Sequence, residues 1–256
     1  MQFNKVYRRA ILLFWISILF FLGCEKNLLT EIESQGPEDM SILSLDKRGP
    51  NSIIPIALAR ADNPRDFVPD FLGDIVTVQG VITSPNSTPQ VGIRHYIQDN
   101  SAAMRIFAWA SISPPVLKMG DEVVVTGVIK QFAGNTFIEL QSTSDLQIVG
   151  TGKLRNPKKI HTAHLDDQVG EKLEGELVVL EKVRVVSGQF DGLGNVRIVD
   201  SKGDTAKVFI DRDYDIVGSA TPSGLFNLTG NVSQYTFDMP ADHYYEIVPR
   251  GLFDIE

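Results

Sequence analysis

Short apolar runs that alternate with polar residues make up much of the chain after its first 70 residues. The runs are rich in Val, Ile, Thr, Phe and Tyr, and clusters of Gly, Asn, Asp, Ser and Pro separate them. A period of two residues is typical of strands with one buried face. The first five runs are 76–82, 92–98, 103–109, 122–131 and 136–149. The pattern therefore predicts an all-β fold.

The same runs recur about one hundred residues later. Gly73–Thr83 matches Gly175–Val186 at an offset of 102, and the run from Met104 matches the run from Ala206 at the same offset. Two further matches have offsets of 101 and 103, and they join Tyr96–Asp99 to Arg197–Asp200 and Gly127 to Gly230. Four matches in one order at nearly one spacing predict a structural unit that is used twice.

Five strands with a long, glycine-led fourth strand resemble the OB-fold, a five-stranded Greek-key barrel. The residues that carry the resemblance are Val76–Val81, Tyr96–Phe107 and Leu117–Leu140. They are similar to OB-fold nucleic-acid-binding domains of secreted bacterial nucleases and of surface lipoproteins of uncertain role. The resemblance covers Ile56–Val149 well and His161–Glu256 more loosely. It implies two tandem OB-like barrels, and the alternative is a β-sandwich, either one large sandwich or two unrelated halves.

Gly and Pro residues mark the boundaries between segments in this part of the chain. We predict a first OB-like domain at 55–149, a linker at 150–160 and a second OB-like domain at 161–256. Each domain has a short helical lead-in, Pro55–Ala61 and His161–Gly175. A small barrel must bend its long strands, and glycine inside a strand permits the bend. The glycines at which we expect these bends are Gly80, Gly127 and Gly230.

The beginning of the chain has the pattern of an export signal. Three basic residues precede the apolar run Ala10–Gly23, which is short for a membrane span. Cys24, the only cysteine, follows this run directly and resembles the lipobox of bacterial lipoproteins, although Phe21 stands where that family usually has Leu. The resemblance implies that the signal peptide 1–23 is cleaved and that Cys24 carries lipid. A buried free thiol and an uncleaved anchor are the alternatives.

Residues 24–54 have weak periodicity and contain several Gly and Pro residues. We interpret them as a flexible tether between the lipid and the barrels. This organisation predicts a lipid-anchored protein of the outer membrane or cell surface.

The third run of the first unit contains the clearest candidate for a binding face. Alternation places two sets of residues on opposite sides of this strand: Met104, Ile106 and Ala108, and Arg105, Phe107 and Trp109. If the first set is core, a cation and two rings point outward, and OB-folds bind single strands by stacking bases on such rings. The predicted ligand-binding residues are Arg94, Tyr96, Arg105, Phe107, Trp109, Lys130 and Phe132. Alternatively, the two rings of this strand fill the core.

The charge of the chain weighs against a polyanionic ligand. The formal net charge is −8, and cleavage after residue 23 removes three basic residues and no acids, which leaves −11. An acidic protein repels a polyanion unless its cations gather on one face. The one basic run is Lys153, Arg155, Lys158 and Lys159. We interpret it as a solvated linker.

Other candidate chemistry is weak. Asp62, Asp66 and Asp70 resemble an aspartate-rich calcium loop, but Pro64 occupies a ligand position and Arg65 adds positive charge. This favours a capped loop without metal. The four histidines lack metal-ligand spacing, and motifs for nucleophilic or phosphate-loop chemistry are missing from the sequence. We therefore predict no metal, no cofactor and no catalytic residue.

Together these features predict a lipid-anchored, non-enzymatic binding module. Its ligand would be single-stranded nucleic acid or an oligosaccharide, both of which OB-folds bind. The alternative function is that of a structural or accessory subunit that packs against a membrane-protein partner.

Overall fold

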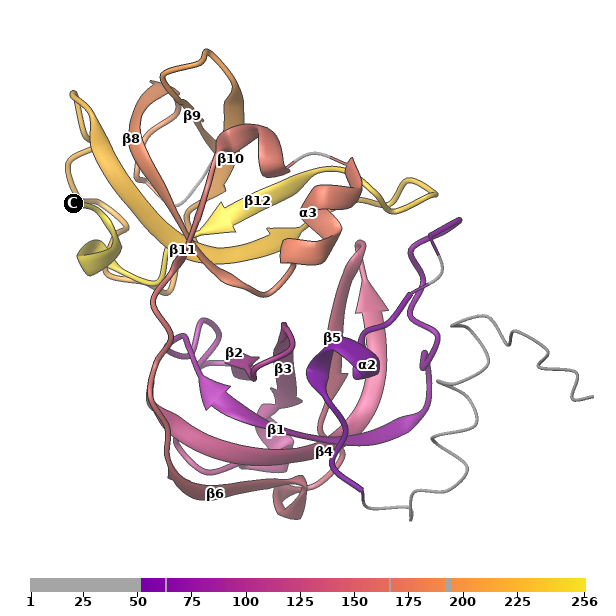
Figure 1. Ribbon diagram of the computed structural model, residues 1–256. Coiled ribbons are helices and arrows are strands. Elements are labelled where there is room, and N and C mark those ends of the chain that lie inside the picture. Colours follow the sequence, from indigo (N-terminus) through magenta and orange to yellow (C-terminus); the bar gives the residue numbers. More distant parts are fainter. Residues whose placement is uncertain (1–51, 63, 166, 192–194) are drawn as a thin grey trace, which may run out of the picture. The chain divides into compact units, whose positions relative to one another are not determined.

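The computed structural model describes residues 52–256 except 63, 166 and 192–194 (Figure 1). The predicted signal peptide, the lipidation site Cys24 and most of the tether lie outside the described residues. Residues 48–256 form one compact unit. No helix in the described part of the chain has the length and apolarity needed to cross a membrane.

Six strands form the first sheet, and five of them close into a barrel. The strands are β1 (Ile75–Ile82), β2 (Gly92–Gln98), β3 (Ala103–Trp109), β4 (Asp121–Phe132), β5 (Asn135–Glu139) and β6 (Leu146–Thr151). Their order is β1-β2-β3-β5-β4-β6, and β1 also pairs with β4. The β3–β5 pair is parallel and the other pairs are antiparallel. This arrangement is that of an OB-like barrel.

The second sheet repeats the five-strand ring of the first. Its strands are β7 (Lys158–Ile160), β8 (Leu177–Ser187), β9 (Asn195–Val199), β10 (Thr205–Phe209), β11 (Phe226–Gln234) and β12 (Tyr245–Val248). Strands β8, β9, β10, β12 and β11 pair in a ring that β11–β8 closes, with β10–β12 parallel. Two rings with one strand order confirm the predicted tandem barrels and exclude the sandwich, because a sandwich leaves its sheets open.

Short helices precede each barrel, as the sequence predicts. They are α2 (Ile56–Ala59) before the first barrel, and the 3-10 turn Thr162–Leu165 and α3 (Asp167–Leu173) before the second. Further 3-10 turns cover Ala110–Ile112, Thr143–Asp145 and Leu252–Asp254.

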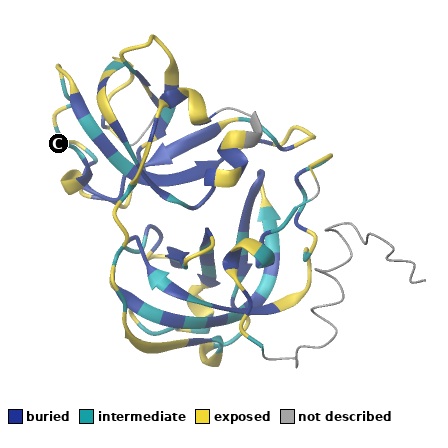
Figure 2. Ribbon diagram, viewed as in Figure 1, coloured by how far each residue is buried: buried dark blue, intermediate teal, exposed yellow. Residues whose placement is uncertain are grey.

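Alternation along the strands builds the core of each barrel. Figure 2 shows buried and less buried positions alternating along several strands. In β4, Val123, Val125 and Ile129 are fully buried, while their neighbours in sequence are partly exposed. The inward side chains fill the barrel interior, which leaves the outward positions for function.

The predicted bending glycines lie where a neighbouring strand passes close to the backbone. A Cβ on Gly127 would stand 2.6 Å from the backbone oxygen of Glu139, and one on Gly80 would stand 2.8 Å from that of Gln98. A Cβ on the equivalent Gly230 would stand 2.7 Å from the backbone oxygen of Val248. These three positions admit no side chain without movement of an adjacent strand.

The structure differs from the sequence prediction at one strand. The predicted run 136–149 is two strands, β5 and β6, separated by the turn Thr143–Asp145. Ser142 and Asp145 cap this turn reciprocally, with Asp145 accepting from the Ser142 amide at 2.8 Å. The five consecutive polar residues Gln141–Asp145 form this turn through local side-chain to backbone bonds, which separate the two strands.

The segments that the sequence predicts as tether and linker both contain β-pairing. In the tether, Ile53 forms a parallel bridge with Thr77, and Ile54 is buried. In the linker, β7 pairs with β8, and Lys159 forms an ion pair with Glu181 at 2.6 Å.

Candidate functional site

One outward face of the first barrel combines rings and cations from three adjacent strands. Cross-strand register places Arg105 of β3 opposite Phe137 of β5, and Phe137 opposite Lys130 of β4. Phe107 and Trp109 follow Arg105 on the same side of β3. We call Arg105, Phe107, Trp109, Lys130 and Phe137 the ring face.

The opposite side of β3 belongs to the core. Met104, Ile106 and Ala108 are at most 2% exposed, whereas Trp109 is 56% exposed. The strand register, and not the hydrophobicity of the rings, decides this orientation, because a shift by one residue would exchange the two sides.

The rings of this face pack edge to face. The ring centroids of Phe107 and Trp109 are 4.9 Å apart at 85°, and those of Phe107 and Phe137 are 6.1 Å apart at 82°. The guanidinium of Arg105 lies 4.9 Å from the Phe137 centroid, within cation–π range. Such packing holds the rings in place and leaves Trp109 open to a planar ligand.

Two predicted site residues lie where this face meets the second barrel. Tyr96, opposite Arg105, is 6% exposed and so is not part of the surface that a ligand can reach. Arg94, opposite Phe107, forms an ion pair with Asp211 of the second barrel at 3.5 Å. The accessible part of the face is therefore the part that contains Phe107 and Trp109.

Phe132, the last predicted site residue, lies at the end of β4. It is 59% exposed, and its ring centroid is 5.7 Å from that of Phe237 in the second barrel. The structure thus places Phe132 beside the other barrel.

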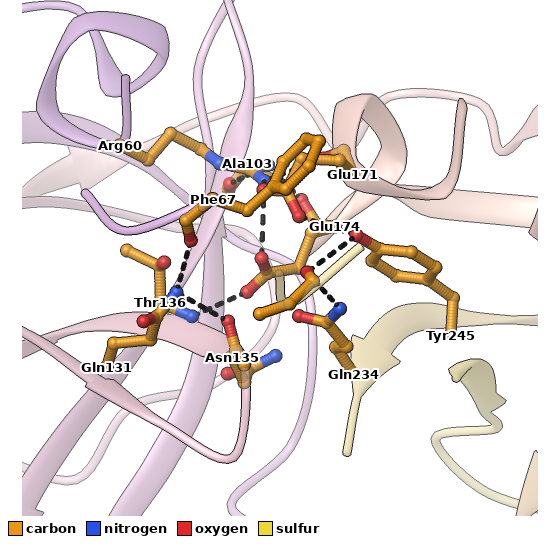
Figure 3. Close-up of polar contacts among 12 residues, drawn as sticks. Arg60, Phe67, Ala103, Gln131, Asn135, Thr136, Glu171, Glu174, Gln234 and Tyr245 are labelled. Atoms are coloured by element: carbon orange, nitrogen blue, oxygen red, sulfur yellow. Dashed lines mark hydrogen bonds and ion pairs between the residues drawn. The ribbon is translucent and has the colours of Figure 1, made fainter. Parts of the chain in front are cut away.

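A buried polar network fixes the second barrel against the first (Figure 3). The Arg60 guanidinium donates to the backbone oxygens of Ala103, Glu171 and Glu174 and to both carboxylates of this glutamate pair. Glu174 Oε1 accepts from the Thr136 amide at 2.8 Å. The network therefore joins strands β3 and β5, which carry part of the ring face, to helix α3.

Burial governs the protonation of this network. Burial raises the pKa of Glu171 and of Glu174, and Arg60 opposes the rise in both. Tyr245 donates a hydrogen bond to Glu171 Oε2 at 2.6 Å. The pKa of Asp62 is raised to about 7, first by burial and then by the neighbouring Glu171.

The remaining candidate residues do not assemble a metal site in the described part of the chain. No group of three or more His, Cys, Asp or Glu residues there is arranged to hold a metal ion. The Asp62–Asp70 loop is closed by a bridge between Asp62 and Pro69, and Asp66 Oδ1 accepts from the Val68 amide.

Sequence reasoning missed two parts of this region. Phe137 could have been found, because alternation within β5 places it outward between the buried residues Thr136 and Ile138. The Arg60 network had no local signal, because Arg60 and its two glutamates are 111 and 114 residues apart.

Comparisons with known proteins give one distant relative and several structural similarities. No protein-family model matches the chain. Over 190 residues the chain is 24% identical to Endonuclease YhcR of Bacillus subtilis (strain 168), an alignment that covers 72% of this chain and 15% of that protein. The chain thus spans only a small fraction of its relative.

Two solved structures are similar in part. The OB domain of MM0293 from Methanosarcina mazei has 11% identity and a TM-score of 0.29, over 33% of this chain and 84% of that one. The HINb domain of p204 has 11% identity and a TM-score of 0.33, over 71% and 95%. Both scores are low, and the OB-like assignment of this chain follows from its strand order.

The relative corrects one prediction. We predicted a protein without enzymatic activity because the sequence contains no recognised catalytic motif. The identity with an endonuclease contradicts that prediction, which we do not retain. The absence of linear catalytic motifs is no evidence for a non-enzymatic protein, because active sites assemble from residues on separate elements and are independent of fold.

Proposed function

We propose that this chain binds single-stranded nucleic acid through the ring face of its first barrel. The observation that carries the proposal is the exposed Trp109 ring, held edge to face against Phe107, on a face that also contains Phe137 and the cation Lys130 opposite it. OB-folds hold single strands by stacking bases on such rings while nearby cations approach phosphates.

The similarity to an endonuclease supports nucleic acid as the ligand class. The short, distant alignment covers a small part of that protein, so a binding role for the shared region fits as well as a role in cleavage. Stacking is tolerant of sequence, and we expect the chain to bind many base sequences with similar affinity.

Because the chain is acidic, we expect base stacking and phosphate contacts to contribute unequally to the binding free energy. Arg94 is already paired with Asp211, and the Nε of Arg105 is buried, which leaves Lys130 as the cation of the face that a phosphate can approach. A protein that contacts about one phosphate of a single strand should show a log–log salt slope of roughly −0.7. Stacking must therefore provide most of the affinity.

Trp109 fluorescence tests this proposal directly. In a chain that begins at Glu25, Trp109 is the only tryptophan. Titration with oligo(dT) should quench its emission, and Trp109→Phe, read by anisotropy of a labelled strand, should retain more affinity than Trp109→Ala. Truncation of one stacking ring costs about 1–3 kcal/mol of binding free energy.

The matched control is Val116→Ala, which alters an exposed apolar residue outside the ring face. This variant should bind like the wild type. Quenching by neutral oligosaccharides and not by oligo(dT) would overturn the nucleic-acid proposal. No response to either ligand would favour the accessory-subunit function instead.

We also propose that lipid on Cys24 anchors the chain in the bacterial envelope, at the outer membrane or cell surface. The apolar run Ala10–Gly23 directly before this cysteine supports the proposal. More than one acyl chain is needed for a stable anchor, as the lipoprotein resemblance implies.

Metabolic labelling with a fatty acid tests the anchor. The wild-type chain expressed in bacteria should incorporate label and sediment with membranes, and Cys24→Ser should do neither. A serine variant that remains labelled would exclude Cys24 as the acceptor. Lys26→Ser, two residues away, serves as the control and should be labelled normally.

A further inference from the structure

A second group of exposed rings lies where the two barrels meet. Phe132 comes from the end of β4, and Tyr235 and Phe237 follow β11. The Phe237 centroid is 5.7 Å from that of Phe132 and 5.5 Å from that of Tyr235. Their exposed fractions are 59%, 54% and 68% for Phe132, Tyr235 and Phe237. We call these three residues the bridging rings.

The backbone beneath the bridging rings is held firmly. The Thr236 amide donates to the backbone oxygen of Ala133 at 2.9 Å, which joins the two barrels directly. Gly134 has φ +80°, and a Cβ there would collide with Gln234 and Thr236. Gln234 Nε2 in turn donates to the Ala241 oxygen at 2.6 Å. The bridging rings remain exposed, because the packed backbone beneath them leaves no apolar interior in which they could be buried.

The bridging rings continue the ring face of the first barrel. Phe132 and Lys130 are two residues apart on β4 and therefore lie on the same side of the strand. Lys130 is opposite Phe137 in the register. Rings and cations thus follow one another from Trp109 across the first barrel to the bridging rings.

The second barrel extends the series beyond Tyr235. The Lys207 ammonium lies 5.9 Å from the Tyr235 centroid. In the repeat, Lys207 of β10 corresponds to Arg105 of β3, and Phe209 corresponds to Phe107. Phe209 is 37% exposed, and Lys207 is paired with Glu246 at 2.7 Å. The second barrel therefore repeats the ring-and-cation pattern of the first.

We propose that one nucleic-acid strand crosses from the ring face over the bridging rings to β10, so that both barrels bind a single ligand molecule. This inference rests on the proposed function. Bases of the strand would stack on the two groups of rings, and its phosphates would approach Lys130, opposite Phe137, and Lys207, near Tyr235. Because Lys207 is partly neutralised by Glu246, the second barrel should contribute mainly through stacking.

Affinity as a function of strand length tests this path. A barrel of this kind takes about 4–16 nucleotides, so oligo(dT) of roughly 5 residues should occupy the ring face alone, and one of roughly 15 should reach the second barrel. Trp109 quenching reports occupation of the ring face in both cases. Phe237→Ala should weaken binding of the long strand about tenfold and leave that of the short strand unchanged.

Two further variants make the result specific. Phe237→Tyr keeps a stacking ring and should restore long-strand affinity. Phe253→Ala removes another exposed ring of the second barrel, 51% exposed, and should change neither affinity. Equal melting temperatures of the variants would exclude misfolding.

Each outcome separates this inference from the proposed function. If Phe237→Ala binds the long strand as tightly as the wild type, the path across the barrels is wrong, although short-strand quenching still supports the ring face. If the wild type gains no affinity with length, the path is also wrong. If neither strand binds the wild type, the proposed function itself fails, and the path fails with it.

Discussion

Asp62 has a pKa that the fold moves into the neutral range. Burial and the neighbouring Glu171 raise its pKa to about 7, from an ordinary value of about 4. Arg60 acts in the opposite direction, and Asp70 adds a smaller rise. At mildly acidic pH the protonated Asp62 therefore shares a hydrogen bond with Glu171 at the boundary between the barrels.

This shift predicts the direction of the pH dependence of stability. Between about pH 4 and 7 the folded chain holds a proton on Asp62 that the unfolded chain has lost, so the unfolding free energy falls as pH rises through this window. Above about pH 7 the contribution is gone. Urea unfolding of wild type and Asp62→Asn at several pH values measures it, since Asn cannot ionise.

The stability difference between wild type and Asp62→Asn should move in favour of Asn as pH rises. Val116→Ala, at an exposed position without an ionisable side chain, serves as the control, and its difference from the wild type should not change with pH. A wild-type advantage that grows with pH would contradict the raised pKa.

At the scale of elements, long strands bend around each barrel at glycines. Gly127 of β4 faces the backbone of β5 so closely that a Cβ would be 2.6 Å from the Glu139 oxygen. The pairing of β4 with both β1 and β5 depends on this approach. The repeated glycine Gly230 has the same role in β11, which pairs with β8 and β12.

Gly127→Ala should therefore destabilise the chain. Overpacking of this kind costs about 1–3 kcal/mol of unfolding free energy, which urea denaturation measures. Gly224→Ala is the matched control, because a Cβ at Gly224 would meet no atom within 4 Å among the described residues. A Gly127 variant as stable as the control would show that β5 moves aside without cost.

At the scale of the whole molecule, two buried arginines connect the barrels. Arg60 of the first barrel binds Glu171 and Glu174 of the second, and Arg250 of the second donates to the Thr83 oxygen of the first at 2.9 Å. Arg250 also pairs with Asp254 at 2.7 Å. Unfolding one barrel alone would break these hydrogen bonds and ion pairs across the boundary while the other barrel stays folded.

We therefore expect the two barrels to unfold together. Trp109 fluorescence reports the first barrel and far-ultraviolet circular dichroism reports both, and their urea transitions should coincide. Arg60→Met should lower both midpoints together, with a loss of about 3–5 kcal/mol. Lys153→Met, at an exposed position, should shift stability by no more than about 0.5 kcal/mol. Separate transitions in the wild type would show independent barrels.

Alternation and repetition account for what the sequence predicted correctly. The strands of the first barrel agree with the apolar runs, except where β5 and β6 were joined into one. The difference lies in the polar segment Gln141–Asp145, whose side-chain hydrogen bonds form a turn between the two strands. Alternation also places Trp109 on the side of β3 opposite Met104, Ile106 and Ala108, because a strand has only two sides, while the structure decides which side faces outward.

The sequence by itself determined the strand positions, the duplication and the two-sided character of β3, because all three depend on residues close together in the chain. Only the tertiary structure decided which part of the outward face stays open. Tyr96 and Arg94 have the same local pattern as their neighbours, yet Tyr96 is buried and Arg94 is paired with Asp211 of the second barrel. The Arg60 network and the bridging rings likewise depend on packing between segments about one hundred residues apart, and no local pattern of hydrophobic and polar residues specifies such contacts.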